Sequence, residues 1–173
     1  MKKNLTLKNI GIVVFSFLGL ILFDQWTKSL AVANLMNQDP FVIIPKVFQL
    51  RYLENRGAAF GMMQGQKTFF VISALVAVLG ILYVYFKLPW EKRFHPLRVV
   101  GTFIAAGAIG NLIDRVALGY VVDFFYFELI DFPIFNVADI YVTCSTIILA
   151  LLILFYYKED ELDCLFPAKK EKK

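Results

Sequence analysis

Four long segments with few or no charged side chains constrain this chain more than any other feature of its sequence. The clearest lies between Lys67 and Lys87, where no Asp, Glu, Lys or Arg occurs. About 20 apolar residues are enough to cross the ~30 Å hydrocarbon core of a bilayer as a helix. The sequence therefore predicts an all-α polytopic membrane protein with four transmembrane helices. We expect the spans at residues 9–33, 68–86, 99–118 and 139–157, within a single domain of residues 1–173.

The basic residues divide unequally between the two sides of these spans. Twelve Lys and Arg residues fall in the N-terminus, the 87–98 loop and the C-terminal segment, whereas five fall in the two opposite loops. Because basic residues concentrate in cytoplasmic loops, we expect both termini in the cytoplasm. The N-terminus also resembles a secretory signal, but Asp24 and Lys28 follow it without a small-residue cleavage site. We therefore predict an uncleaved first helix.

The segments outside the spans differ in character. In the first extracytoplasmic loop, residues 34–67, two apolar or alternating segments at 41–44 and 47–53 predict a small β-cradle. The second such loop is rich in Phe and Tyr between residues 120 and 136, which suits the membrane interface. On the opposite side, residues 158–173 end in a Lys-rich stretch, which we interpret as a solvated cytoplasmic tail.

Four carboxylates from separate segments are predicted to lie at one depth in the membrane. With a rise of 1.5 Å per residue, Asp24 lies roughly 22 Å beyond the start of the first span, and Asp114 lies similarly far along the third. Asp139 opens the fourth span, and Asp123 lies in the loop before it. Ionisable groups at this depth are costly and by default mark a functional site. Each alone could be an interfacial residue in contact with water, but the convergence of all four favours a site.

Spacing within these segments suggests local partners. Asp24 and Lys28 are four residues apart on one helix face, and we interpret them as a structural ion pair. Two further groups have helical spacing, Asn111 with Asp114 and Arg115, and Asn136 with Asp139. Either member of the second group could simply be the N-cap of the last helix.

The motifs of other hydrolases are missing. The sequence has no His-Glu-x-x-His zinc motif and no Gly-x-Ser-x-Gly elbow, and its one His, His95, lies on the side opposite the carboxylates. Ser29 with Lys28 is disfavoured as a catalytic pair because adjacent helix positions do not face each other. One His and two Cys give no zinc cage, so we predict no metal and no cofactor. No basic stripe with interleaved aromatics occurs, so no nucleic-acid partner is expected.

Paired carboxylates remain as the candidate chemistry. Two close carboxyl groups cannot both ionise easily, so they share one proton. The ionised group can take a proton from water, and the protonated group can donate a hydrogen bond to a scissile carbonyl and later protonate the leaving amine. Such a pair would hydrolyse a peptide without a metal or a covalent intermediate.

Five segments, in order, resemble the motifs of the lipoprotein signal peptidases, the signal peptidase II family. The first is Phe23-Asp24-Gln25 with Lys28, and the second is Glu54-Asn55-Arg56-Gly57-Ala58-Ala59-Phe60-Gly61. The third is Gly107-Ala108-Ile109-Gly110-Asn111-Leu112-Ile113-Asp114-Arg115. The last two are Val121-Val122-Asp123-Phe124 and Phe132-Pro133-Ile134-Phe135-Asn136-Val137-Ala138-Asp139. Each is weak alone, but five in the family's order on a four-span chain are very specific.

The resemblance implies an aspartic-type endopeptidase with Asp123 and Asp139 as its catalytic dyad. It implies that Asn55, Gly57, Asn111, Arg115 and Asn136 contact substrate or orient the dyad, and that Asp24, Lys28 and Asp114 support the site. The implied substrate is a diacylglyceryl-modified prolipoprotein, cut just before its lipidated cysteine at the outer face of the bacterial cell membrane. Globomycin would inhibit the enzyme. We expect a monomer whose other partners are membrane lipids.

One position departs from the family pattern, and two other readings remain. Many members have a small hydroxyl residue after the second catalytic Asp, where this chain has Ile140-Tyr141, so the hydrogen bonding around Asp139 is in question. A proton- or cation-coupled transporter could use the same carboxylates, but it would need a polar path to the cytoplasmic side. A non-catalytic scaffold would explain Gly107 and Gly110 as helix-packing residues but not the converging carboxylates.

Overall fold

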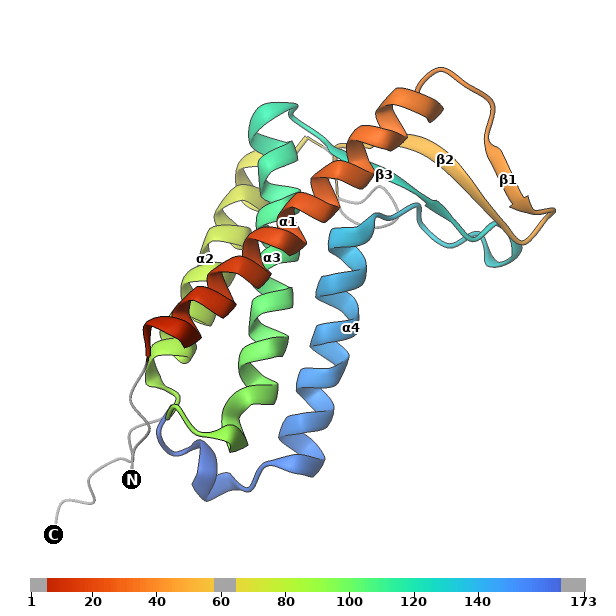
Figure 1. Ribbon diagram of the computed structural model, residues 1–173. Coiled ribbons are helices and arrows are strands. Elements are labelled where there is room, and N and C mark those ends of the chain that lie inside the picture. Colours follow the sequence, from red (N-terminus) through yellow and green to blue (C-terminus); the bar gives the residue numbers. More distant parts are fainter. Residues whose placement is uncertain (1–5, 58–64, 166–173) are drawn as a thin grey trace, which may run out of the picture.

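The computed structural model describes residues 6–57 and 65–165, and four of its helices are long and apolar enough to cross a membrane (Figure 1). They are α1 (Leu7–Leu35), α2 (Lys67–Lys87), α3 (His95–Ala117), which follows a 3₁₀ turn at Lys92–Phe94, and α4 (Val137–Leu151). A π-helical turn at Leu152–Tyr156 continues α4. The four helices expected from the sequence are thus present. All four begin slightly before the predicted spans, and polar residues such as Thr6 and Asn136 cap the starts of α1 and α4, whereas α3 and the extension of α4 end one residue before the predicted ends.

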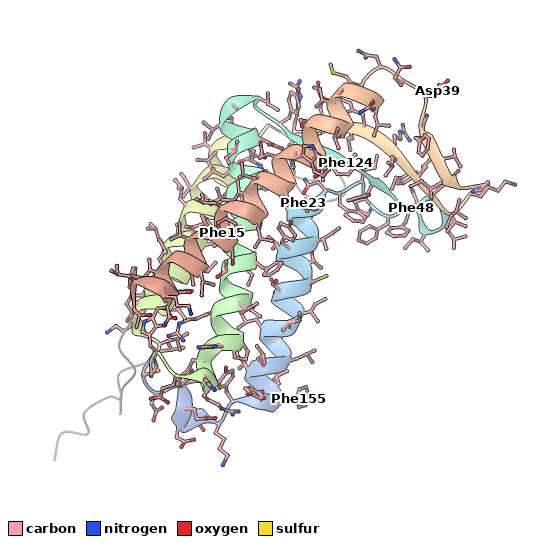
Figure 2. The ribbon with its side chains drawn as sticks, viewed as in Figure 1. Phe15, Phe23, Asp39, Phe48, Phe124 and Phe155 are labelled. Atoms are coloured by element: carbon pink, nitrogen blue, oxygen red, sulfur yellow. The ribbon has the colours of Figure 1, made fainter. Side chains whose placement is uncertain are left out.

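The outer surfaces of the helices suit lipid rather than water. No residue of α2 is buried, although the helix carries no charged side chain between Lys67 and Lys87. Phe15 of α1 and Phe155 after α4 are each 81% exposed and point away from the bundle (Figure 2). In a bilayer such side chains contact acyl chains, and the backbone bonds within each helix leave no polar group unpaired. Helix α3 lies between the others and packs against α1, α2 and α4 (Figure 1).

A three-stranded antiparallel sheet extends from one end of the bundle (Figure 1). Strands β1 (Phe41–Ile44) and β2 (Phe48–Asn55) form the hairpin expected in the first loop, with Lys46 in its turn at a φ of 59°. The third strand, β3 (Val121–Tyr126), comes from the connection between α3 and α4 and pairs with β2. The cradle is therefore built from two loops, whereas the sequence pattern predicted it in residues 34–67 alone.

The missed strand has a physical explanation. Its residues 121–124 are all buried, so their side chains do not alternate between apolar and polar, and this alternation is the main sequence signal of a half-exposed strand. The aromatic residues of this connection pack on one another rather than only facing the membrane interface. Phe125 and Phe135, for example, have ring centroids 5.6 Å apart and are joined by backbone hydrogen bonds.

Two glycines of α3 allow the close contacts on which the site depends. A Cβ atom at Gly107 would lie 2.5 Å from the backbone oxygen of Ala138, so α3 and α4 can meet only because this position has no side chain. At Gly110 a Cβ atom would lie 2.5 Å from Oδ2 of Asp24, which brings α1 against α3. Both glycines therefore do pack helices, as the scaffold alternative supposed, but the contacts that they allow also position Asp24 and the start of α4.

The opposite end of the bundle is closed by residues that follow α4. Phe94 and Tyr157 stack with ring centroids 5.9 Å apart, and the Tyr157 hydroxyl donates to the backbone oxygen of Arg93 at 2.7 Å. The guanidinium of Arg93 pairs with Glu161 at 2.8 Å. The first part of the expected tail, residues 158–165, is therefore fastened to the start of α3, and residues 166–173 lie outside the described part of the chain.

Candidate active site

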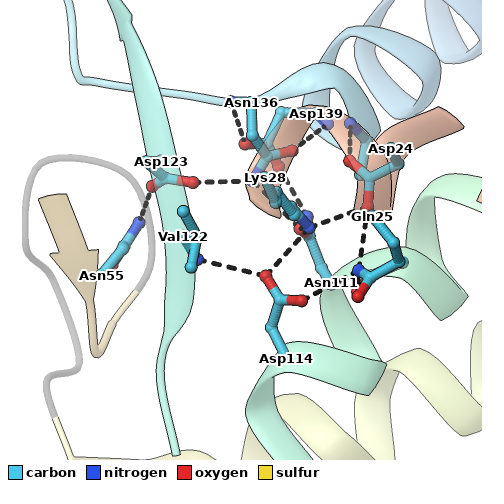
Figure 3. Close-up of polar contacts among 12 residues, drawn as sticks. Asp24, Gln25, Lys28, Asn55, Asn111, Asp114, Val122, Asp123, Asn136 and Asp139 are labelled. Atoms are coloured by element: carbon cyan, nitrogen blue, oxygen red, sulfur yellow. Dashed lines mark hydrogen bonds and ion pairs between the residues drawn. The ribbon is translucent and has the colours of Figure 1, made fainter. Parts of the chain in front are cut away.

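The four predicted carboxylates come together at the end of the bundle that carries the sheet (Figure 3). They lie on four elements: Asp24 on α1, Asp114 near the end of α3, Asp123 on β3 and Asp139 in the first turn of α4. Asp24, Asp114 and Asp123 are at most 3% exposed, whereas Asp139 is partly exposed. The chain thus buries three carboxyl groups and leaves one at the edge of a cavity.

Lys28 holds the deeper pair of carboxylates together. Its Nζ lies 2.9 Å from Oδ2 of Asp24, 3.0 Å from Oδ2 of Asp114 and 2.9 Å from the side-chain oxygen of Asn111. An ammonium group has three N–H donors, so these three acceptors satisfy it fully. Removing one partner of such a buried group would leave an uncompensated charge, which is strongly destabilising. The structural ion pair expected for Asp24 and Lys28 is present, and Asp114 joins it.

The two deeper carboxylates also hold the segments that carry the other two. Oδ1 of Asp24 accepts a hydrogen bond from the backbone N–H of Ala138 at 2.9 Å, and Oδ2 of Asp114 accepts one from that of Val122 at 3.1 Å. Ala138 and Val122 are the residues immediately before Asp139 and Asp123. Each supporting carboxylate therefore fixes the backbone next to one member of the candidate dyad.

Neutral amide groups contact every oxygen of Asp123 and Asp139. Asp123 accepts hydrogen bonds from Nδ2 of Asn136 at 2.6 Å and from Nδ2 of Asn55 at 2.7 Å. Asp139 accepts from Nδ2 of Asn111 at 2.8 Å and from the backbone N–H of Asn136 at 3.1 Å. Asn136 thus bridges the two carboxyl groups (Figure 3). Because these donors are uncharged, they orient the carboxyl groups without forcing both to ionise.

Local sequence explains how two of these asparagines reach the pair. Asn136 is the N-cap of α4: its side-chain oxygen accepts from the backbone N–H of Asp139 at 3.0 Å, and Asp139 completes a capping box. The capping role considered from the sequence is therefore real, and it leaves the Asn136 amide free to contact Asp123. Asn55 pairs with Val121 across the sheet, so Asp123, two residues further along, lies diagonally opposite on the same face.

Burial sets the protonation behaviour of Asp123. Burial, and after it the neighbouring carboxylate of Asp139, raise the pKa of this carboxyl from 3.8 to about 7. The hydrogen bonds from Asn55 and Asn136 favour the charged form and partly offset this shift. Near neutral pH the two carboxyl groups can therefore hold one proton between them.

A cavity of about 500 Å³ opens beside the pair. Asp123 and Asp139 line it together with Asn55, Gly57 and Arg115. The guanidinium carbon of Arg115 lies 4.8 Å from the ring centroid of Phe70 on α2. The other lining residues are mostly apolar: Phe132, Pro133, Ile134, Phe135, Ile140, Thr143 and Cys144. The lining combines a few polar groups with a mainly apolar surface, so it suits a peptide that carries an apolar group better than a small polar solute.

Three residues near the carboxylates, Gln25, Ile140 and Tyr141, had no role assigned from the sequence. Gln25 donates to Oδ1 of Asp114 at 2.9 Å and to the backbone oxygen of Gly110 at 3.1 Å, so it joins α1 to α3. In the sequence its signals were its position beside Asp24 and its place in the first motif. Ile140 lines the cavity, while Tyr141 packs edge-on against Phe103. The hydrogen bonds to Asp139 come from amide groups, namely the side chain of Asn111 and the backbone of Asn136.

The second motif and His95 lie in different parts of the structure. Asn55 accepts a hydrogen bond from the backbone N–H of Gly57 at 3.0 Å while its amide donates to Asp123, so the start of the second motif is joined to the candidate dyad. The rest of that motif, residues 58–61, lies outside the described part of the chain. His95 lies at the opposite end of α3 and contacts none of the carboxylates.

Comparisons with known proteins agree with this arrangement. The family model for signal peptidase (SPase) II matches residues 16–155, which include all four carboxylates. The lipoprotein signal peptidase of Streptococcus thermophilus is 45% identical over 145 residues, covering 84% of this chain and 92% of that protein. That of Symbiobacterium thermophilum is 47% identical over 133 residues, covering 76% of this chain and 86% of that protein.

A solved structure shares the whole architecture. A bacterial membrane enzyme determined by the in meso method at 2.3 Å resolution superposes with a TM-score of 0.76 at 31% identity, covering 100% of this chain and 99% of that one. The sequence match extends across α1 to α4, and the structural match includes the helices and the sheet. This protein belongs to the signal peptidase II family.

Proposed function

We propose that the chain is an intramembrane aspartyl endopeptidase in which Asp123 and Asp139 form the catalytic dyad. The observation that carries this proposal is the bridge through Asn136, which donates to Asp123 from its side chain and to Asp139 from its backbone, beside a cavity that both residues line. Family membership favours a peptidase over the transporter that the same carboxylates could serve.

The dyad would hydrolyse the peptide bond by general acid–base catalysis. With one proton shared, the ionised carboxyl group takes a proton from a water molecule placed between the two groups. The protonated group donates a hydrogen bond to the scissile carbonyl, stabilises the tetrahedral oxyanion and then supplies the proton of the leaving amine. The raised pKa of Asp123, caused first by burial and then by Asp139, supports this shared-proton state near neutral pH.

Residues around the dyad would hold the substrate backbone. Arg115 faces the same cavity with five N–H donors, which suit peptide carbonyls. Gly57 lines the cavity without a side chain, so an extended peptide can approach Asn55 and the dyad closely. Asn111 and Asn136 would keep the dyad oriented, and Asp24, Lys28 and Asp114 would support them from below.

The substrate that fits best is a diacylglyceryl-modified prolipoprotein, cut just before its lipidated cysteine. Relatives 40–47% identical to this chain are named lipoprotein signal peptidases. The apolar side of the cavity, with Phe70, Ile140 and Cys144, would accept the lipid-bearing part of the substrate, and acyl chains in the bilayer would hold the scissile bond at this depth. Globomycin would compete for the same cavity, and the enzyme would act as a monomer.

The proposed location follows from the charge distribution. The sequence places twelve basic residues in the N-terminus, the 87–98 loop and the C-terminal segment, and we assign these segments to the cytoplasmic side of a bacterial cell membrane. The start of α1, the α2–α3 connection and the residues after α4 share this end (Figure 1). The carboxylates and the sheet would then face the outer leaflet.

The decisive experiment is cleavage of a synthetic lipidated precursor peptide by purified protein in detergent. We expect Asp123→Asn and Asp139→Asn each to fold but to lose at least ~10³-fold in initial rate, with no further loss in the double variant, because the two groups act as one unit. Asp131→Asn is the matched control: Asp131 lies in the same connection, is exposed and has a φ of 48°, which Asn also adopts.

Two results would overturn the proposal. One is a substantial rate in either dyad variant, which would make Asp114 the next candidate. The other is equal turnover of lipidated and unlipidated precursor, since lipidation is expected to place the scissile bond.

A further inference from the structure

A second cavity lies at the end of the bundle opposite the carboxylates. It measures about 390 Å³ and is lined by α1, α3, Tyr85 near the end of α2 and the connection between α2 and α3. Its polar and aromatic lining residues are Asn9, Ser16, Tyr85, Trp90, His95, Arg98, Thr102 and Phe103. None of them takes part in the site described above, so the cavity needs its own explanation.

Arg98 is the unusual residue of this cavity. It is 5% exposed, and its Nη2 donates to the backbone oxygens of Leu88 at 2.9 Å and Pro89 at 2.8 Å. Its Nε and Nη1 atoms are buried and have no hydrogen-bond partner within residues 6–57 and 65–165, and no carboxylate of those residues pairs with it. A guanidinium cannot lose its charge in a protein, so burial without a counter-charge is costly.

The rings beside Arg98 do not meet this need. Its Cζ atom lies 4.1 Å from the ring centroid of Trp90 and 5.6 Å from that of Tyr85. A ring face attracts a cation but leaves in-plane N–H groups without acceptors. The Tyr85 hydroxyl is itself buried with no partner in the described part of the chain. Three unsatisfied polar atoms thus belong to two residues that line one cavity, and an anion with several oxygens could bond them.

An apolar groove adjoins this cavity. It measures about 580 Å³, lies between α1, α2 and α3, and shares four lining residues with the polar cavity: Val13, Tyr85, Trp90 and Thr102. Its remaining walls are almost wholly apolar, with Phe17, Leu82 and Phe86 among them. A charged pocket that continues into an apolar groove has the shape and polarity of a lipid with an anionic head and a long acyl chain.

We propose that this cavity binds an anionic phospholipid, with the lipid phosphate at Arg98 and one acyl chain in the groove. Water could bond the free N–H groups but would leave the buried positive charge uncompensated, whereas a phosphate supplies both acceptors and charge. The lipid belongs to the leaflet opposite the active site, and its assignment to the cytoplasmic leaflet rests on the orientation proposed above. Its function is to tie α1 to α2 and α3 at the end farthest from the dyad.

Tryptophan fluorescence tests binding directly, without any measurement of cleavage. The chain has two tryptophans, and Trp26 lies on the outer half of α1, so Trp26→Phe leaves Trp90 as the single reporter. In detergent micelles, phosphatidylglycerol with brominated acyl chains should quench Trp90 at about fivefold lower concentration than brominated phosphatidylcholine. That ratio corresponds to roughly 1 kcal/mol for one basic residue.

Two variants and one control separate this site from general attraction to anionic lipid. Arg98→Gln should abolish the preference for phosphatidylglycerol. Ser16→Phe, which fills the cavity and leaves Arg98 in place, should reduce quenching by both lipids even if the arginine variant fails to fold. Lys92→Gln, at an exposed position on the same end, should change neither.

Three outcomes would overturn the proposal. They are equal quenching by the two lipids in the Trp26→Phe protein, an unchanged preference in folded Arg98→Gln, and full competition by equimolar inorganic phosphate, which would indicate a site for free anions. Because quenching is independent of turnover, a failure here leaves the proposed peptidase untouched, and an inactive dyad leaves this test intact.

Discussion

The side chain of Asp24 accepts a hydrogen bond from the backbone N–H of Ala138, a residue 114 positions later in the chain and immediately before Asp139. The same carboxylate pairs with Lys28, so one buried side chain joins the first helix to the first turn of the last. An equivalent bond joins Asp114 to Val122, immediately before Asp123. The candidate dyad is therefore positioned through its backbone as well as through its side chains.

Asp24→Asn should weaken the protein and reduce, but not abolish, cleavage. The Asn oxygen can still accept from Ala138, whereas Lys28 loses one of its two anionic partners. Removing a partner from a buried ion pair costs about 3–5 kcal/mol. Thermal unfolding in detergent, with initial rates on the lipidated peptide, measures both effects. Asp39→Asn, at an exposed position beyond α1, should resemble the wild type. A fully stable Asp24→Asn protein would contradict the role given to the Lys28 cluster.

The rate of cleavage should fall as the pH rises past about 7, because the pair then loses the proton that it shares. The pKa of Asp123 is raised to about 7 by burial and by Asp139, while its bond from Asn55 lowers it. Asn55→Ala removes that bond and should move the alkaline limb of the profile to higher pH. Asn34→Ala, at an exposed site on α1, should leave the limb in place. A limb that does not move in Asn55→Ala would dissociate this pKa from catalysis.

The stability of the folded protein should also depend on pH through the Asp123 carboxyl group. The folded protein holds the Asp123 proton more tightly than the unfolded chain, in which this carboxyl has a pKa near 3.8. The stabilisation from this group is therefore fully present below pH 3.8. It is lost progressively as the pH rises through about 7. The pH dependence of the unfolding temperature should therefore become flatter in Asp123→Asn than in the wild type, and an identical slope would argue against the raised pKa.

Gly107→Ala should force α3 and α4 apart where they contact each other and thereby displace the candidate dyad. The new Cβ atom would lie 2.5 Å from the backbone oxygen of Ala138 and 2.8 Å from Cγ2 of Val142, and the backbone atom cannot rotate away. Overpacking of this kind costs about 1–3 kcal/mol, and the shift of α4 should also lower the rate. Gly80→Ala, where no atom lies within 4 Å of the new methyl group, is the control. Equal behaviour of the two variants in unfolding and cleavage assays would show that the contact is not needed.

Reporter fusions should establish the orientation. Fusions after residue 60 and after residue 128 are expected to report the outside, and fusions after residue 92 and at the C-terminus the cytoplasm, because basic residues concentrate at the latter end. Alkaline phosphatase and green fluorescent protein report the two sides with opposite signals. A cytoplasmic signal at residue 60 would reverse the orientation and move the site to the other face.

The helices and the carboxylate positions could be predicted from sequence because both depend on local composition. The charge-free stretch in α2 and the helical rise to Asp24 needed no tertiary information. The third strand could not be predicted, since β3 is buried on both sides and lacks an alternating pattern. The hydrogen bonds from the backbone N–H groups of Val122 and Ala138 could not be predicted either, because every residue except proline has such a group.

The distribution of the site over the chain has a consequence for biosynthesis. Its residues come from α1, β2, α3, β3 and α4, and Asn136 and Asp139 belong to the last of these to leave the ribosome. A nascent chain with three inserted helices can already form the Lys28 cluster, but it has neither the second carboxyl group of the candidate dyad nor the bridging amide. Hydrolytic competence would therefore begin only after the fourth helix has entered the membrane, so an incompletely synthesised protease could not cut its neighbours.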